Sequence, residues 1–255
     1  MNYAINTMDG IKLISRSYEE IYNDRIISIM KQNRCSREEA VAELDEEERL
    51  YNEQEKQNEL EMINTRLKNN GVPCDLIKAS FENYQTITQS QTEALNISRT
   101  FLQNKDFLTL VFTGNHGMGK SHLGVSLLRE KAGIGKYVTS KDICLEFSDV
   151  KRQFGESQLT LLKEYAAVEF LVIDEFGFTY DGSDDRPIIQ GILFDRISAK
   201  KKTVLISNKD QKQTITDLGA KIIDRMKLCG KIYELKGMSF REQLAARLKK
   251  PAPAA

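Results

Sequence analysis

The residues from Gly114 to Ser121 form the pattern in this sequence best suited to chemistry. They read Gly-Asn-His-Gly-Met-Gly-Lys-Ser and match G-x-x-x-x-G-K-[ST] without a gap. In such a loop the glycines let successive backbone N–H groups face phosphate oxygens, and the following helix adds the positive end of its dipole. An apolar run precedes the loop and a helical pattern follows it, which is the context that the motif requires. We therefore predict a nucleotide site whose binding residues are Gly114, Asn115, His116, Gly117, Met118, Gly119, Lys120, Ser121 and His122.

Two side chains of this loop are expected to act on the phosphates. Lys120 is expected to reach the β- and γ-phosphates, and the Ser121 hydroxyl is expected to ligate Mg²⁺. The two histidines suggest metal or acid–base chemistry at first sight. His116 occupies a variable position of the motif, however, and His122 lies in the first turn of the following helix. We interpret both as structural.

A pair of carboxylates follows the apolar run at residues 170–173. An apolar run that ends in Asp174 and Glu175 is typical of a buried strand that delivers acids to the edge of a sheet, where ligands bind. Asp174 is predicted to hold the Mg²⁺ shell, and Glu175 to orient or deprotonate the attacking water. No NKxD-like guanine selector is present, so the pattern favours hydrolysis of ATP, with ATP and Mg²⁺ as cofactors.

A parallel sheet is needed to bring these groups together. Short apolar runs alternate with helical patterns after Gly71, and this alternation predicts an α/β fold with helices on both faces of the sheet. Asn208 follows the expected strand 203–207 and is predicted to help position the water near the γ-phosphate. The alternative is that Asn208 is only a turn residue. The expected strands are 107–113, 136–139, 170–174, 203–207 and 231–235, and the expected helices are 120–131, 142–154, 184–199 and 221–228.

The residues before Gly71 read as helix throughout. Ser36 and Glu39 have the spacing of a capping box, and Gly71 followed by Pro73 would end the helix that begins there. The prediction is a small all-helical domain at 1–70, an ATPase domain at 71–248 and a disordered tail at 249–255. An apolar stripe is expected at Tyr18, Ile21, Tyr22, Ile26, Ile29 and Met30.

Composition and charge limit the function classes. Among 255 residues, 40% are hydrophobic and 29% charged, with zero formal net charge, and no segment has the length and apolar character of a membrane span. Four scattered cysteines give neither a zinc site nor a disulfide framework, so a cytoplasmic protein is expected.

Charge is unevenly distributed along the chain: residues 37–68 are predominantly acidic and 200–250 predominantly basic. The polar stretch 51–60 is either solvated or covered by a partner protein.

Several motifs in order resemble the DnaC and IstB-type ATPases. The resemblance covers residues 71–245 and includes Ser80–Tyr84 and Gly119–Leu123, then 170–177, 203–208, 224–226 and 239–241. It implies an AAA+ module that oligomerises, with a hexamer as one candidate size, and with ATP sites between neighbours. Arg225 resembles the arginine finger that completes the next subunit's site, and Arg241 a sensor arginine that contacts phosphate. Tyr84 would lie near the adenine or belong to the core.

The same resemblance suggests partners. In helicase loaders the helical insertion at 142–154 contacts single-stranded DNA, which makes Lys151, Arg152 and Phe154 candidate DNA-binding residues, with Phe147 as another candidate for base stacking. Burial of both aromatic residues against the sheet is the competing interpretation. A helical front domain grips the hexameric replicative helicase in such loaders, although no motif in residues 1–70 matches one residue by residue.

Three functions are therefore open. The first is an ATP-dependent loader that binds the replicative helicase and single-stranded DNA during replication initiation. The second is an IstB-like transposition helper that acts on duplex DNA. The third is an interaction module that binds nucleotide as a switch and scarcely turns it over. An acidic helical front domain suits a protein partner better than DNA and so favours the first.

Overall fold

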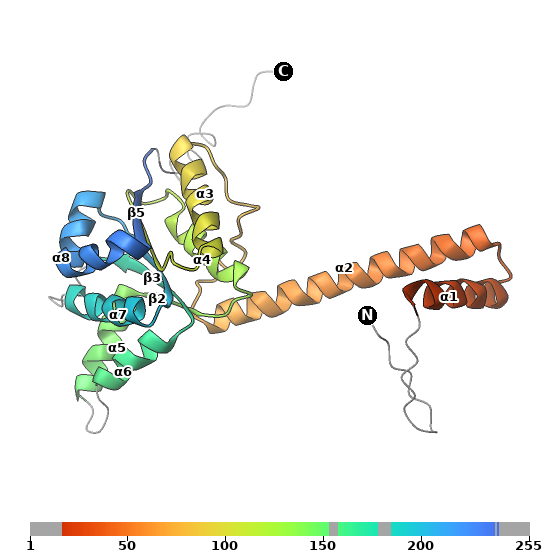
Figure 1. Ribbon diagram of the computed structural model, residues 1–255, viewed down its shortest axis with the longest axis horizontal. Coiled ribbons are helices and arrows are strands. Elements are labelled where there is room, and N and C mark those ends of the chain that lie inside the picture. The colour runs from red at the N-terminus through yellow and green to blue at the C-terminus, as the bar shows by residue number, and fades with distance from the viewer. Residues whose placement is uncertain (1–16, 153–157, 178–184, 238, 240–255) are drawn as a thin grey trace, which may run out of the picture. The chain divides into compact units, whose positions relative to one another are not determined.

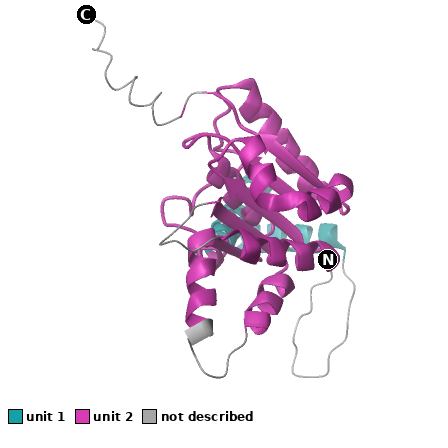
Figure 2. Ribbon diagram, turned by 90° about the vertical axis from the view of Figure 1, so that its left-hand side faces the viewer, with its two compact units in different colours: residues 1–61 teal, residues 62–255 magenta. Residues whose placement is uncertain are grey.

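The computed structural model describes residues 17–152, 158–177, 185–237 and 239, without the side chains of 151 and 152. The chain divides into two compact units, residues 1–61 and 62–255 (Figure 2). The sequence predicted domains that meet at 70/71 instead. The difference arises because the last turns of helix α2 (Arg37–Asn69) pack on the second unit. There Leu67 is fully buried in the core, and the Asn70 side chain donates a hydrogen bond to Gly133 O at 2.7 Å.

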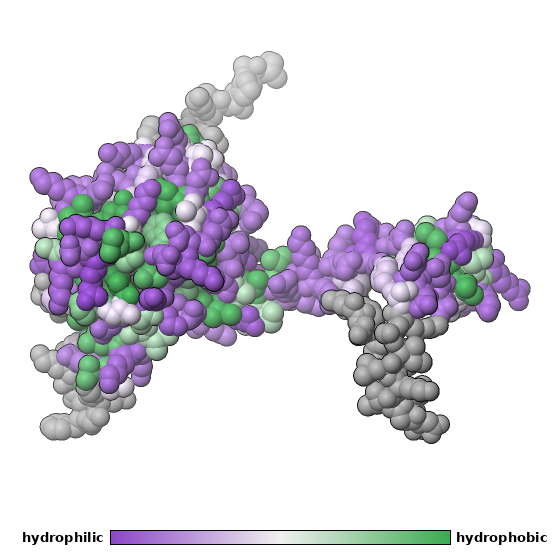
Figure 3. Space-filling model, viewed as in Figure 1, coloured by the Kyte–Doolittle hydropathy of each residue, from purple (hydrophilic) through white to green (hydrophobic). Residues whose placement is uncertain are grey.

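The first unit is built on α1 (Tyr18–Asn33) and the greater part of α2. The predicted capping box is confirmed: Ser36 N donates to Glu39 Oε2 at 2.8 Å, and Glu39 N donates to Ser36 Oγ at 3.2 Å. A small core contains Ile26, Ala40 and Leu44. Hydrophilic side chains cover most of the visible surface of this unit, with a few hydrophobic ones among them (Figure 3).

The apolar stripe predicted on α1 is only partly correct. Ile26 is buried, and Tyr22, Ile29 and Met30 pack against the small core. Tyr18, by contrast, is 65% exposed, and its hydroxyl donates to Glu48 at 3.1 Å. The tyrosine hydroxyl can remain in water beside a carboxylate, so helical spacing alone does not bury it.

The second unit contains the predicted parallel sheet (Figure 1). Its strands are β1 (Thr109–Thr113), β2 (Lys136–Thr139), β3 (Phe170–Phe176), β4 (Lys202–Ser207) and β5 (Gly230–Glu234), in the order β2-β3-β4-β1-β5, and every pairing is parallel. Alternate residues serve opposite faces, because side chains alternate along a strand. Leu110 and Phe112 enter one core with α3 (Gln89–Gln103) and α4 (Lys120–Glu130), whereas Val111 enters the other. The α/β fold with both faces covered is confirmed.

The second face is covered by α5 (Ser140–Arg152), α6 (Gln158–Ala167), α7 (Arg186–Ser198) and α8 (Gln211–Cys229). Two helices, α3 and α6, were not predicted. The N-terminus of α3 does carry a capping box between Thr88 and Gln91 that the sequence displays. Helix α8 begins well before the predicted Lys221, and a left-handed Gly219 (φ 75°) interrupts its helical geometry. Among the described helices, none is long and apolar enough to cross a bilayer.

Candidate nucleotide-binding site

A cavity of about 600 Å³ lies where β1, β3 and β4 end. The carboxyl ends of parallel strands share one edge of the sheet, which is where ligands bind in such folds. The cavity brings together predicted residues from three separate segments and adds residues from the segment before β1. Its lining residues are Leu76, Asn83, Tyr84, Gln85, Gln91, His116, Gly117, Gly119, Lys120, Ser121, His122, Asp174, Glu175 and Asn208.

The phosphate-binding loop, Gly114–Ser121, owes its course to glycine. Gly119 is the N-cap of α4 with φ 87°, and a Cβ placed on it would lie 2.6 Å from Tyr84 Cε2. A side chain there would be strained and would collide with an aromatic ring. Lys120, the first residue of α4, therefore follows a turn that only glycine adopts at low cost, and the helix N-terminus faces the cavity.

Lys120 is held at this loop. Its ammonium donates to Gly114 O at 2.6 Å and to Asn115 O at 2.7 Å, and the residue is 4% exposed. Burial lowers the pKa of Lys120 to about 8, while the nearby Asp174 acts in the opposite sense. Gly114 and Asn115 thus contribute backbone carbonyls that orient this cation.

The lowered pKa of Lys120 predicts a pH dependence of ATP binding. Phosphate contact would raise the pKa above its value of about 8 in the free protein, so binding takes up a proton above that pH. Affinity should therefore be retained below about pH 8 and fall by as much as about tenfold per pH unit above it. Calorimetric titration with ATP from about pH 7.5 to about pH 9.5 measures this change in affinity. In Lys120→Arg the guanidinium stays charged over this range, so the affinity should depend little on pH. An equally steep decline in Lys120→Arg would contradict the assignment to Lys120.

The carboxylate of Asp174 is fixed by two hydrogen bonds. Its Oδ1 accepts from Glu175 N at 2.7 Å, and its Oδ2 accepts a short hydrogen bond from the Tyr137 hydroxyl. Burial, and then the charge of Asp174, raise the pKa of Tyr137, while a hydrogen bond with Ser121 opposes this. The Tyr137 hydroxyl thus orients Asp174, one of the two predicted Mg²⁺ ligands. Hydroxyl and carboxylate oxygens with an orienting hydrogen bond are a donor set that fits Mg²⁺.

Glu175 takes an unusual backbone conformation. Its φ is 61°, in the left-handed region, and the β3–β4 register shifts between Ile173 and Phe176. Asp174 is buried, whereas Glu175 is exposed at the cavity edge. The two adjacent carboxylates therefore lie in different environments.

The opposite part of the cavity contains Tyr84, His122 and Gln91. The Tyr84 hydroxyl donates to Met118 O at 3.2 Å, and the ring is 8% exposed and belongs to the core. The core interpretation of Tyr84 is confirmed, and since Tyr84 also lines the cavity, its place near the adenine stays a prediction. His122 Nε2 lies 2.9 Å from Ser80 O, and burial lowers the pKa of its imidazole. A neutral ring held by a backbone carbonyl fits the structural interpretation of His122.

Some residues of the site were not predicted from the sequence. Tyr137 is the most important of them: it does not line the cavity, and it contacts Asp174 because its strand, β2, pairs with β3. Leu76, Asn83, Gln85 and Gln91 also line the cavity, and of these only Asn83, in Ser80–Tyr84, and Gln91, in the α3 capping box, belong to a sequence motif. Their contribution to the cavity depends on the tertiary fold.

Other predicted residues lie away from the cavity. Arg225 is on α8, where its guanidinium lies over the Phe194 ring at 3.8 Å and donates to Ser198 Oγ at 3.0 Å. Phe147 is 3% exposed and belongs to the core, so the prediction that it could stack on a base is wrong. Phe154 and Arg241 lie outside the described residues, as do the side chains of Lys151 and Arg152.

Comparisons with known proteins bear on the family and the fold. Residues 22–247 match the family model of IstB-like ATP binding proteins. The replicative helicase loader DnaC of Escherichia coli strain K12 is 30% identical over 174 residues, which are 66% of this chain and 71% of that protein. A crystal structure of the DnaC helicase loader superimposes with a TM-score of 0.55 at 23% identity, covering 64% of this chain and all of that one. The structure of AMPPCP-bound DnaA from Aquifex aeolicus superimposes with a TM-score of 0.54 at 18% identity, covering 69% of this chain and 57% of that one.

Proposed function

This chain belongs to the IstB-like ATP binding proteins and is a DnaC-like AAA+ protein, and from that premise we propose that it is an ATP-dependent loader of a replicative DNA helicase. The observation that carries the proposal is the 30% identity with a replicative helicase loader, extending over 71% of that protein. The third hypothesis, a switch that scarcely turns over, is disfavoured because Lys120, Ser121, Asp174 and Glu175 line one cavity.

The proposed reaction is hydrolysis of ATP in the 600 Å³ cavity. Lys120 and the loop N–H groups bind the phosphates, and Ser121 and Asp174 hold Mg²⁺, which neutralises charge on the phosphate oxygens when bound. Glu175 accepts the proton of the attacking water, and Asn208 positions that water. Tyr137 keeps the Asp174 carboxylate oriented through its hydrogen bond.

An oligomer is proposed because Arg225 does not line the cavity of its own subunit. Charge that builds on the γ-phosphoryl oxygens is stabilised by a planar guanidinium fork. Stacking on Phe194 holds the Arg225 guanidinium part-exposed on α8, where a neighbouring subunit's site could receive it. Arg241 is proposed as the second phosphate-contacting arginine, and a hexamer is one candidate assembly.

The proposed partners are the hexameric helicase and single-stranded DNA. The first unit presents carboxylates on α2 that interact with α1, including Glu47 with Arg25 at 2.8 Å and Asp45 with the Tyr22 hydroxyl at 2.6 Å. We assign helicase binding to this acidic helical unit. Single-stranded DNA binding is assigned to Lys151, Arg152 and Phe154; the buried Phe147 leaves Phe154 as the stacking candidate.

Co-elution with the host's replicative helicase tests the loader function. The full chain should co-elute with the helicase in the presence of ATP and Mg²⁺, and a 62–255 truncation should not. This truncation keeps Leu67 and Asn70, which pack on the second unit, and so spares the ATPase fold. Retained binding of ATP by the truncation is the control.

Co-elution of neither form would remove the loader function. The family match to IstB-like proteins favours a second candidate, a transposition helper that assembles on duplex DNA. ATP-dependent filament formation on duplex DNA by the same preparation would then support that candidate.

A further inference from the structure

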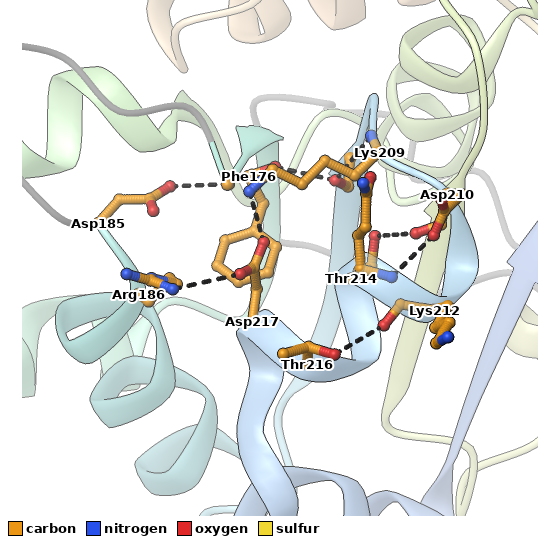
Figure 4. A network of polar contacts seen from close by, with 12 residues as sticks. Phe176, Asp185, Arg186, Lys209, Asp210, Lys212, Thr214, Thr216 and Asp217 are labelled. Atoms are coloured by element: carbon orange, nitrogen blue, oxygen red, sulfur yellow. Dashed lines mark hydrogen bonds and ion pairs between the residues drawn. The ribbon is translucent and has the colours of Figure 1, made fainter.

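Three ion-paired side chains meet at the turn that follows β3 (Figure 4). The Asp217 carboxylate on α8 lies between two cations: Lys209 Nζ at 2.6 Å from Oδ2 and an Arg186 guanidinium nitrogen at 3.5 Å from Oδ1. Asp217 is only 7% exposed, and its backbone carbonyl accepts a hydrogen bond from Gln190 at 2.8 Å. Burial of a carboxylate carries a desolvation cost, and the two cations beside Asp217 offset part of that cost.

The ion pair packs directly on Gly177, the first residue after β3 and two residues beyond Glu175. A Cβ on Gly177 (φ 85°) would lie 2.9 Å from Lys209 Nζ and 3.1 Å from Asp217 Oδ2. The other side of this turn is held by Asp185, whose Oδ2 accepts from Gly177 N at 2.9 Å. The turn is thus fixed between the Lys209–Asp217 pair and a second buried carboxylate.

Lys209 also joins the cavity segments through its backbone. It follows Asn208 directly, and its carbonyl accepts from Gly114 N, the first residue of the phosphate-binding loop, at 2.9 Å. Its own N–H donates to Ser207 Oγ at 3.3 Å, and Ser207 Oγ donates to Phe176 O at 2.9 Å. One residue therefore connects the ends of β1, β3 and β4.

We propose that Asp217, through its ion pair with Lys209, is a positioning residue for ATP hydrolysis. A non-glycine residue with φ 61°, as at Glu175, keeps that conformation only where its surroundings impose it. The pair packs on Gly177, two residues beyond Glu175, and it anchors Lys209, the residue after Asn208. The Glu175 carboxylate, which activates the water, and the Asn208 amide, which positions it, are thereby held in a fixed arrangement relative to each other. This inference rests on the proposed function, because it concerns the roles assigned to Glu175 and Asn208.

The test compares kcat and ATP affinity in charge-removing variants of the full chain. Asp217→Asn and Lys209→Met should each lower kcat by about tenfold to hundredfold, because small displacements of catalytic groups have effects of that size. The Kd for Mg-ATP should change by no more than about twofold, because neither side chain lines the cavity. Lys209→Arg keeps the charge and should retain most of kcat. The double variant should be no worse than either single one, because the two residues act as a pair.

Glu169→Gln is the matched control. Glu169 and Lys201 form an ion pair just before β3 and β4 begin, at the opposite end of the same two strands. If Asp217 has a purely structural role, Asp217→Asn should lower the midpoint of thermal unfolding but leave kcat of the folded protein at the Glu169→Gln value. That result would overturn this inference and leave the proposed ATPase function standing. If the wild-type protein shows no ATP hydrolysis, or if its hydrolysis does not depend on Glu175, both the proposed ATPase function and this inference are overturned.

Discussion

Replacing Glu175 by Gln should reduce the kcat of ATP hydrolysis by about two orders of magnitude or more, as expected when a general base is removed. The amide keeps the size of the carboxylate but cannot accept the proton of the attacking water. Glu175 lies exposed at the cavity edge, whereas the adjacent Asp174 is buried and engaged by Tyr137. The substitution should therefore leave ATP binding nearly unchanged. Single-turnover hydrolysis measures the chemical step, and fluorescence of a labelled nucleotide measures its affinity.

The outcome separates an ATPase from a nucleotide-operated switch. Glu130→Gln, at the C-terminal end of α4 and outside the cavity lining, provides a matched substitution on the surface. Hydrolysis by Glu175→Gln at the rate of this control would contradict the catalytic role of Glu175. Loss of hydrolysis with helicase binding preserved would show that turnover acts after the complex has formed.

The contiguous parts of the site were predictable from sequence because the chemistry constrains neighbouring residues. The loop from Gly114 to Ser121 needs glycine at fixed positions, and Gly119 shows why: it has φ 87°, and an added Cβ would collide with Tyr84. Asp174 and Glu175 follow an apolar strand, and this order predicted their place at the sheet edge. The sheet itself followed from the alternation of strand and helix patterns, and the family predicted from these motifs is confirmed.

Contacts between distant segments were not predictable in the same way. Tyr137 meets Asp174 only because β2 pairs with β3 in a register that places Thr139 beside Asp174. Lys209 meets Asp217 because α8 begins at Gln211, before the kink at Gly219, whereas the sequence pattern predicted only the part after the kink, from Lys221. From the sequence, Tyr137 is an ordinary tyrosine in a strand, and Lys209 and Asp217 are ordinary surface charges. Neither contact can be predicted from the residue types alone.

The domain boundary illustrates the same limit. Gly71 and Pro73 do mark the end of a helix, and α2 ends at Asn69. The end of a helix is not the end of a packing unit, however. Because Leu67 is buried in the core of the second unit, the compact units separate within α2.

Replacing Arg225 by Ala should lower the kcat of the assembled protein by about a thousandfold, the lower range of arginine-finger effects. The expected cause is the loss of a planar cation at the γ-phosphate of a neighbouring subunit. Nucleotide affinity should change little, because Arg225 does not line its own cavity. Steady-state hydrolysis above the concentration at which the protein assembles is the measurement. Arg99→Ala is the matched control, because Arg99 also lies over an aromatic ring, Phe81, at 6.0 Å.

Mixing two inactive variants distinguishes action on a neighbour from action within one subunit. Lys120→Ala should abolish phosphate binding in its own site yet still present Arg225 to the next subunit. In a mixture with Arg225→Ala, some interfaces combine an intact Lys120 with a neighbour's intact Arg225, and hydrolysis should recover in part. If Arg225 acted on its own subunit's nucleotide, no interface in the mixture would be complete and the activity would stay at the level of the separate variants. Recovery that disappears on dilution below the assembly concentration would place the active site between subunits, because only an interface depends on mass action.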